Sequence, residues 1–281
     1  MKRASFLPAL CHHLLLGLLA LCWLLPILWL VVTSFGVDEG PNIRSFFPES
    51  FTLTHYRTLF SPDSVSRFPQ WFLNTLIVAL FNCAISTIFV LSTAYAMSFL
   101  RFRFRRGLMQ CALILNLFPG FLGMIAVYFL LREMGLTNSL TGLVLVYSAS
   151  AGIDYLIAKG FFDTVSPALR ESAQLEGANE WITFTRIILP LSRPIVVYTV
   201  ISTFLYPWMD FVYASILLPS GIAADKTVAL GLFSLVDKVN RNRYFAQFCA
   251  GGVIVSLPIS VLFIIMQRFY VEGVTNGAVK G

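Results

Sequence analysis

Charged residues are scarce in this chain. Only 12% of its 281 residues are Asp, Glu, Lys or Arg, whereas 57% are apolar and 26 are Phe. A soluble domain carries about 25% charged residues, so the composition excludes a large soluble domain and indicates a polytopic membrane protein. The formal charge of +6 is therefore interpreted through its distribution among loops, and not as a sign of nucleic-acid binding.

The residues that usually form catalytic, metal or nucleotide sites are also few. The five cysteines form no CxxC pair, and the three histidines have no cysteine or carboxylate at ligand spacing, so we expect neither a disulfide framework nor a metal site. No GxxxxGK[ST] segment occurs, which excludes a phosphate-binding loop of this kind. Clusters of His with Asp, Glu or Ser are absent too, so we predict no catalytic residue and no cofactor bound by this chain.

Long apolar runs dominate the sequence instead. Each is close to or above the roughly 20 residues that a membrane-spanning helix needs. They predict one all-α transmembrane domain over residues 1–281 with six spans, at about 12–33, 71–100, 108–131, 140–158, 195–218 and 245–270. We expect the first run to be an uncleaved span, because no good cleavage site follows it. Asn74 and Asn82 of the second run are expected to hydrogen-bond across to other helices.

Topology follows from one basic loop. Four arginines occur within residues 101–106, a density typical of a cytoplasmic loop. A patch for anionic lipid or nucleic acid is the weaker alternative, because the loop is so short. The loop assignment predicts a multi-pass protein of the cell membrane with both termini in the cytoplasm.

Two apolar runs are interrupted by proline and polar residues. The third run contains Asn116 and Pro119, and a proline inside a span kinks the helix or opens a flexible segment. The fifth contains the segment 204–211, FLYPWMDF. Asp210 is an intramembrane or interfacial charge and hence a functional candidate; the alternative is an aromatic belt at the outer interface.

The longest patterned polar stretch covers residues 166–189. Ser166 followed by Pro167 predicts a hydroxyl-capped helix start, with the helix over 168–176. Gly177 suits the left-handed residue that ends a helix, and Asn179 can cap a second short helix. From this pattern alone, a helix hairpin lying on lipid headgroups remains an equal alternative.

The spacing within this stretch resembles a known motif. Glu171-Ser172-Ala173, three residues, Gly177, nine residues and then residues 187–190, IILP, is similar to the "EAA" loop of ABC importer permeases, although Ser172 replaces the usual Ala. The resemblance implies a cytoplasmic coupling helix that docks on a separate ATPase subunit. The coupling residues that it implies are Glu171, Ser172, Ala173, Glu176, Gly177 and Asn179.

Most of the chain carries the same resemblance. The segments FPGFLGMIAVYFLL and MGLTNSLTGLVLVY and the tail from residue 267 to 281 are similar to the smaller membrane subunit of maltose/maltodextrin-type importers, which have the type I permease fold. The implied partners are a second permease subunit, two ATPase subunits that use ATP and Mg, an external solute-binding protein, an oligosaccharide and membrane lipid, with no nucleic acid.

Two further groups of residues acquire expected roles from this comparison. The translocation path is expected to include Tyr206, Trp208, Asp210, Phe211 and Asn116. The outer loop 219–244 is basic on the side where positive charge is disfavoured, and part of it, KTVALGLFSLVD, predicts a short helix. Contact with the solute-binding protein is expected from Lys238, Arg241 and Arg243.

Other transport classes remain open on the sequence. An ABC permease for another solute would share the 171–190 loop. An ion-coupled secondary transporter would need ionisable groups at mid-membrane, and Asp154 and Asp210 are too few and too near the ends of their runs. We expect Asp154 to reach the headgroup region or Lys159. The identity of the sugar is not encoded in these patterns.

Overall fold

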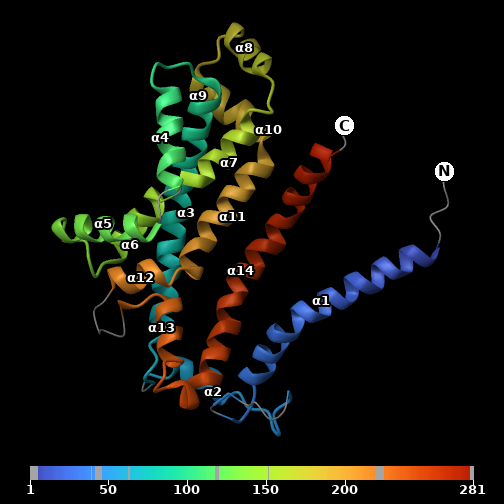
Figure 1. Cartoon of the computed structure of the whole chain (residues 1–281), viewed down its shortest axis with the longest axis vertical. Coiled ribbons are helices and arrows are strands. Elements are labelled where there is room, and N and C mark those ends of the chain that lie inside the picture. The colour runs from blue at the N-terminus through green and yellow to red at the C-terminus, as the bar shows by residue number, and fades with distance from the viewer. Residues whose placement is uncertain are drawn as a thin grey trace. The chain divides into compact units, whose positions relative to one another are not determined.

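The computed structural model is all-helical, as the sequence predicts (Figure 1). It describes residues 6–38, 40–41, 46–62, 64–117, 120–150, 152–218 and 225–278. Over these residues the sole β-type pairing is an isolated bridge between Gly36 and Phe51. The chain divides into two compact units, Met1–Pro69 with Gly231–Ser256, and Gln70–Leu230 with Leu257–Gly281, which are described separately.

The first unit contains α1 (Phe6–Ser34), α2 (Thr54–Phe60) and the beginning of α14 (Arg241–Ala278). The hydroxyl groups of Ser34 and Tyr56 lie 2.7 Å apart, which connects the end of α1 to α2. The most apolar window of α1 has no buried residue within the chain, although Thr33 and Ser34 at the end of the helix are buried. Such a surface requires lipid or another subunit around it.

The second unit is built around α3 (Phe68–Phe99), a helix of 32 residues. Its polar groups are satisfied by neighbouring segments: Asn74 Nδ2 donates to the carbonyl oxygen of Lys226 at 3.1 Å and Asn82 Nδ2 to that of Thr203 at 2.6 Å. The prediction of a hydrogen bond to another helix is thus confirmed for Asn82, whose partner lies in α11, whereas the partner of Asn74 lies in the segment just before α13.

The remaining helices of the chain are short and follow α3 in sequence. They are α4 (Arg105–Leu117), α5 (Gly120–Glu133), α6 (Leu140–Ala149), α7 (Gly152–Phe162), α8 (Pro167–Leu175), α9 (Glu180–Ile182), the π-helix η1 (Thr183–Ile188), α10 (Leu189–Leu191), α11 (Arg193–Met209), α12 (Val212–Leu217) and α13 (Val228–Leu235). The helix α13 confirms the helix that was predicted in the outer loop.

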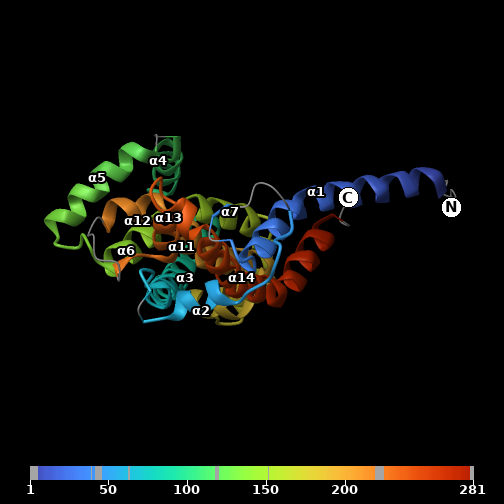
Figure 2. The ribbon, with the colours of Figure 1, turned by 90° about the horizontal axis from the view of Figure 1, so that it is seen from below.

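Several predicted spans are divided in the structure. The third run becomes α4 and α5, which run in different directions in both views (Figure 1, Figure 2). The fourth is assigned as α6 and α7, although Leu140–Phe162 together count as one candidate span. Among the described residues, four helical stretches are long and apolar enough to cross a membrane, or five if the bent pair Glu180–Leu191 and Arg193–Met209 counts as one span. The count of six spans therefore stays a prediction.

The partner of Asp154 differs from the expected one. Lys159 pairs with Asp163, one helical turn further along the chain, while the hydroxyl of Ser202 on α11 lies 3.5 Å from the Asp154 carboxylate. Lys159 pairs with Asp163 because the two residues are four positions apart, a spacing at which side chains meet on one helix face.

Candidate functional site

The 166–189 segment folds into a sharp helical hairpin. Helix α8 ends at Leu175, and Gly177 adopts φ +88°, the left-handed conformation predicted for it. The Asn179 side chain then accepts a hydrogen bond from the Ile182 N–H at 2.8 Å and caps α9, as predicted. Ser166 does precede α8, but its hydroxyl makes no capping bond, so the hydroxyl cap was wrong.

The second arm of the hairpin is irregular. Residues 183–188 form a π-helix, η1, a rare geometry that often marks functional sites. The arm Glu180–Leu191 then meets α11 at an angle of 89°. Pro194 lies in the first turn of α11, where its missing N–H costs no helical hydrogen bond. The corner therefore redirects the chain sharply as it enters the fifth apolar run.

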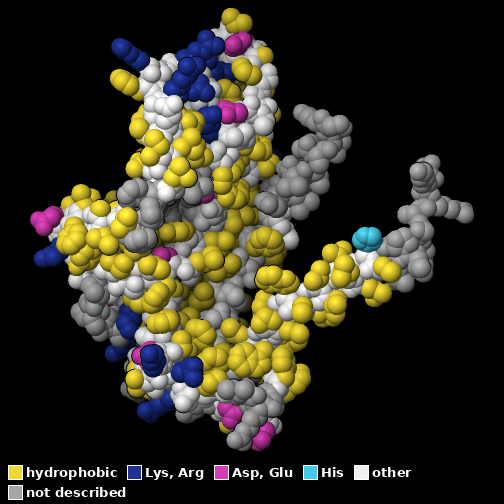
Figure 3. Space-filling view, in the orientation of Figure 1, with side chains coloured by type: hydrophobic (Ala, Val, Ile, Leu, Met, Phe, Trp, Pro, Cys, Tyr) yellow, Lys and Arg dark blue, Asp and Glu magenta, His cyan; other side chains and the backbone are white. Residues whose placement is uncertain are grey.

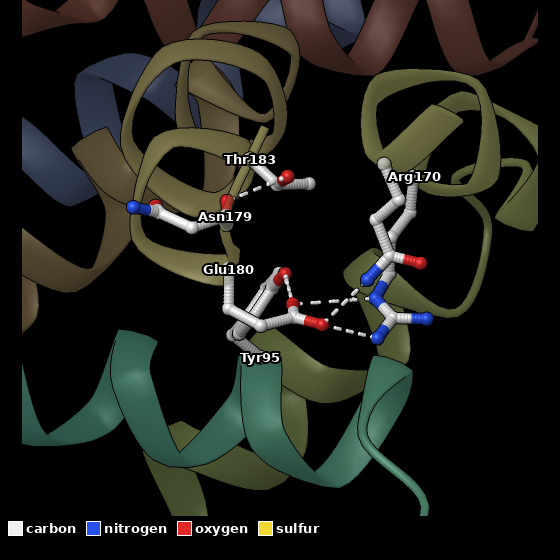
Figure 4. A network of polar contacts seen from close by, with 6 residues as sticks. Tyr95, Arg170, Asn179, Glu180 and Thr183 are labelled. Carbon is white, nitrogen blue, oxygen red and sulfur yellow. Dashed lines mark hydrogen bonds and ion pairs between the residues drawn. The ribbon is translucent and has the colours of Figure 1, made fainter. Parts of the chain in front are cut away.

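A polar network fastens the two arms to each other and to α3 (Figure 4). The Glu180 carboxylate accepts a hydrogen bond from the Tyr95 hydroxyl at 2.5 Å and from Gln174 Nε2 at 2.7 Å. Arg170 of α8 forms an ion pair with the same carboxylate. Because the arginine donates to the charged form, the pKa of Glu180 is lowered. Glu180 is thus the point where α8, α9 and α3 are joined.

Apolar packing fixes the inner side of the same segment. Phe184 and Ile188 are buried in a cluster with residues of α3, α7 and α11, and the rings of Phe184 and Tyr95 are 4.8 Å apart. Burying side chains of this size contributes on the order of 1.5–3 kcal/mol each. The hairpin is therefore packed against α3, α7 and α11.

The outer side of the hairpin is exposed. Leu175 is 90% exposed and Trp181 is 70% exposed, which is costly for large apolar side chains unless another surface covers them. Of the residues predicted to couple to an ATPase, five are exposed: Glu171, Ser172, Glu176, Gly177 and Asn179. Ala173 is different, with 5% exposure. Its expected contact with a partner is not available, because the methyl group packs inside this chain.

The expected path residues lie around the break between α11 and α12. Trp208 is buried, and its ring packs 5.2 Å from that of Phe72. The Asp210 carboxylate accepts hydrogen bonds from the Tyr147 hydroxyl at 2.8 Å and from the backbone N–H groups of Tyr213 and Ala214. Asp210 therefore caps the first turn of α12 and satisfies a tyrosine that is itself buried.

The other path candidates are more accessible. Tyr206 is 41% exposed and Phe211 is half-buried. Asn116 belongs to the end of α4, but its side chain lies outside the described residues. The structure thus brings Tyr206, Asp210 and Phe211 together at one helix break, whereas the Trp208 side chain is buried in the interior.

The basic residues of the outer loop are found in the first unit. Lys238 lies in the turn before α14, and Arg241 and Arg243 lie in its first turn. All three side chains are exposed, and none forms an ion pair with another described residue. Arg243 instead lies over the ring of Tyr244, 5.4 Å from its centre. These charges are accessible to an external partner.

Sequence reasoning missed the residues that hold the hairpin together. Arg170, Glu180 and Tyr95 were not singled out, although Glu180 follows the capping residue Asn179 directly and so lies in the first turn of a helix, where a carboxylate is favoured. That position was the available signal. Tyr95 lies 85 residues before its partner, and no local pattern indicates such a pair.

Comparisons with known proteins agree with this arrangement. The family model "Binding-protein-dependent transport system inner membrane component" matches residues 91–276. The chain is 34% identical to the galactooligosaccharides transport system permease protein GanQ of Bacillus subtilis (strain 168), covering 100% of this chain and 99% of that one. It is 30% identical to the maltose/maltodextrin transport system permease protein MalG of Escherichia coli (strain K12), covering 96% and 95%.

A solved structure has the same fold. It is a chain of a bacterial ABC transporter involved in the import of the acidic polysaccharide alginate, with a TM-score of 0.78, 22% sequence identity, and coverage of 96% of this chain and 99% of that one. Since the family model spans about two thirds of the sequence and the curated relatives span nearly all of it, the expectation of a membrane-embedded, non-catalytic permease is confirmed. The chain belongs to the family of binding-protein-dependent transport system inner membrane components.

Proposed function

We propose that this chain is one permease subunit of an ATP-driven importer of oligosaccharides, and that residues 166–189 transmit the movement of a separate ATPase to the spans. One observation carries the proposal: the hairpin is clamped on its inner side through Glu180 and Phe184 and bare on its outer side. A rigid element with an exposed outer surface can pass on a push, which a flexible loop would absorb.

The substrate class is proposed from the relatives. GanQ is named for galactooligosaccharides and MalG for maltose and maltodextrin, and a solved neighbour with a TM-score of 0.66 was crystallised with an alginate pentasaccharide-bound periplasmic protein. These substrates share the chemistry of sugar oligomers and differ in the sugar and its charge. An oligosaccharide is therefore the substrate proposed here, with maltodextrin as one member of the class.

The remaining partners follow from the same proposal. A second permease subunit would cover the exposed apolar surfaces, two ATPase subunits would bind and hydrolyse MgATP, and both termini would lie in the cytoplasm. An external solute-binding protein would meet Lys238, Arg241 and Arg243, where charge complementarity mainly affects the association rate. The path would run past Tyr206 and Phe211, with Trp208, Asp210 and Asn116 shaping the walls around it.

Transport by the reconstituted complex tests the proposal. The chain is co-purified with its cognate permease, ATPases and binding protein in proteoliposomes, and uptake of labelled maltodextrin and galactooligosaccharide is measured with ATP on the ATPase side. We expect uptake of at least one oligosaccharide that needs both ATP and the binding protein. Uptake driven by a proton or sodium gradient without ATP would overturn the proposal in favour of a secondary transporter.

A further inference from the structure

A cavity of about 970 Å³ lies beside the 166–189 hairpin. Its walls come from the end of α3, the loop before α4, the end of α7 and α8. Apolar side chains, among them Phe99, Phe162 and Val165, form part of the lining, and Arg101 and Arg105 form another part. Glu171 is the one expected coupling residue that also lines this space.

Two charged side chains of the lining already have partners in the chain. Asp163 is paired with Lys159, and Arg170 is paired with Glu180. Each of these two charges is neutralised by a residue of this chain. Neither Asp163 nor Arg170 therefore contributes a free charge to the cavity.

Arg101 and Arg105 are the positive charges that remain. Neither forms an ion pair with any described residue, and Glu171 is the one lining carboxylate that is likewise unpaired among them. The cavity is therefore basic on balance. Figure 3 shows the surrounding basic surface, with Lys and Arg side chains gathered over the part that carries α8 and the start of α4. An arginine guanidinium binds phosphate through two parallel hydrogen bonds.

Aromatic residues alternate with these arginines. Phe102 is 39% exposed and Phe104 is 72% exposed, and both directly follow the end of the membrane-spanning helix α3 at Phe99. At the boundary between membrane and water, such rings reach the acyl region while the neighbouring basic groups stay at headgroup level. The loop thus alternates exposed rings with basic side chains, a pattern that suits contact with a phospholipid.

We propose that the cavity binds the headgroup of an anionic phospholipid from the adjacent leaflet, with its phosphate held by Arg101 and Arg105. The glycerol and acyl chains leave the cavity alongside Phe102 and Phe104. Because α8 forms one wall, the bound lipid braces the hairpin against α3. Anionic lipid would then be a component of the coupling region and not merely the solvent around it.

Lipid titration of the intact transporter complex tests this proposal. Wild-type complex and the Arg101→Gln/Arg105→Gln variant are placed in nanodiscs of phosphatidylcholine with increasing phosphatidylglycerol, and bound phosphatidylglycerol is counted by native mass spectrometry. The apparent affinity should fall about fivefold for each arginine removed, as expected for a basic residue at a membrane surface. An excess of inorganic phosphate should not displace the lipid, because phosphate lacks the acyl anchor.

The control changes the same charge in the same loop. Arg103 and Arg106 do not line the cavity that holds the phosphate, so Arg103→Gln/Arg106→Gln should leave the affinity within about twofold. Equal losses in both double variants, or no loss in either, would overturn the proposal. Unchanged lipid binding with loss of the ATPase from Arg101→Gln/Arg105→Gln would also overturn it, and would assign the cavity to that subunit.

A second measurement covers the case in which the variant does not assemble. Wild-type complex is irradiated with a photoactivatable phosphatidylglycerol, and the labelled peptides are sequenced. Labelling within 98–105 and 162–174 is expected. Labelling confined to other segments would contradict the site.

Discussion

Two carboxylates of the second unit accept a hydrogen bond from a buried tyrosine, and the two differ in what else surrounds them. Asp210 pairs with Tyr147 at 2.8 Å, and Glu180 pairs with Tyr95 at 2.5 Å. The other donors to Asp210 are backbone N–H groups of α12. The other donors to Glu180 are side chains of α8, including the cation Arg170.

The difference separates a carboxylate at a helix break from a carboxylate beside an exposed hairpin. At Asp210 the donors are a tyrosine hydroxyl and two backbone N–H groups, all neutral, so the carboxylate completes the fold at the end of α11. At Glu180 the charge is balanced by an arginine of a neighbouring short helix, and the residues around it stay exposed. The Asp210 carboxylate is satisfied within its own group of helices, whereas the Glu180 carboxylate stabilises a hairpin whose other side is exposed.

Replacing Asp210 should have the largest effect on folding. Asp210→Ala leaves the buried Tyr147 hydroxyl and the first turn of α12 without acceptors, at a cost of about 2–4 kcal/mol from the lost cap and the unsatisfied group. The thermal midpoint of the purified complex should fall clearly. Asp210→Asn retains one acceptor oxygen, so its thermal midpoint should fall less. Equal thermal midpoints for Asp210→Ala and wild type would place Asp210 in the path and not in the fold.

Replacing Glu180 should have an intermediate effect. Glu180→Ala removes the acceptor for Tyr95, Arg170 and Gln174, but the Glu180 side chain is 40% exposed, so water replaces part of what is lost and about 1 kcal/mol is expected. Hydrogen exchange of α8 should rise while that of α3 does not. Glu180→Gln keeps a carbonyl acceptor and serves as the matched control. If hydrogen exchange rises equally in α8 and α3, the Glu180 network does not act on α8 alone, and this prediction is wrong.

The sequence predicted those features that depend on neighbouring residues in the chain. The positive φ of Gly177 and the cap by Asn179 follow from the chemistry of single residues beside a helix end. Helix α4 ends at Leu117 and α5 begins at Gly120, at the interruption predicted in the third run. In each case the cause lies within a few positions of its effect.

The features that were missed depend on tertiary contacts. The hydrogen bond from Tyr147 to Asp210 joins residues 63 positions apart, so no local pattern indicates it. Ala173 was expected to meet a partner because of its place in a motif, yet it faces the interior. The π-helix η1 packs against α3 and α7 through Phe184 and Ile188, contacts that no helical periodicity records.

The smallest effect on folding and the clearest effect on coupling are expected at Glu171, which is exposed and has no ion pair among the described residues. Glu171→Lys should leave the thermal midpoint unchanged and should weaken attachment of the ATPase, measured with the purified subunits, by at least about tenfold, because charge reversal at a partly desolvated contact is costly. Glu133→Lys, the same change at an exposed site at the end of α5, should attach the ATPase normally. Wild-type attachment and uptake by Glu171→Lys would contradict the assignment of the 166–189 hairpin as the point where ATPase movement enters the membrane.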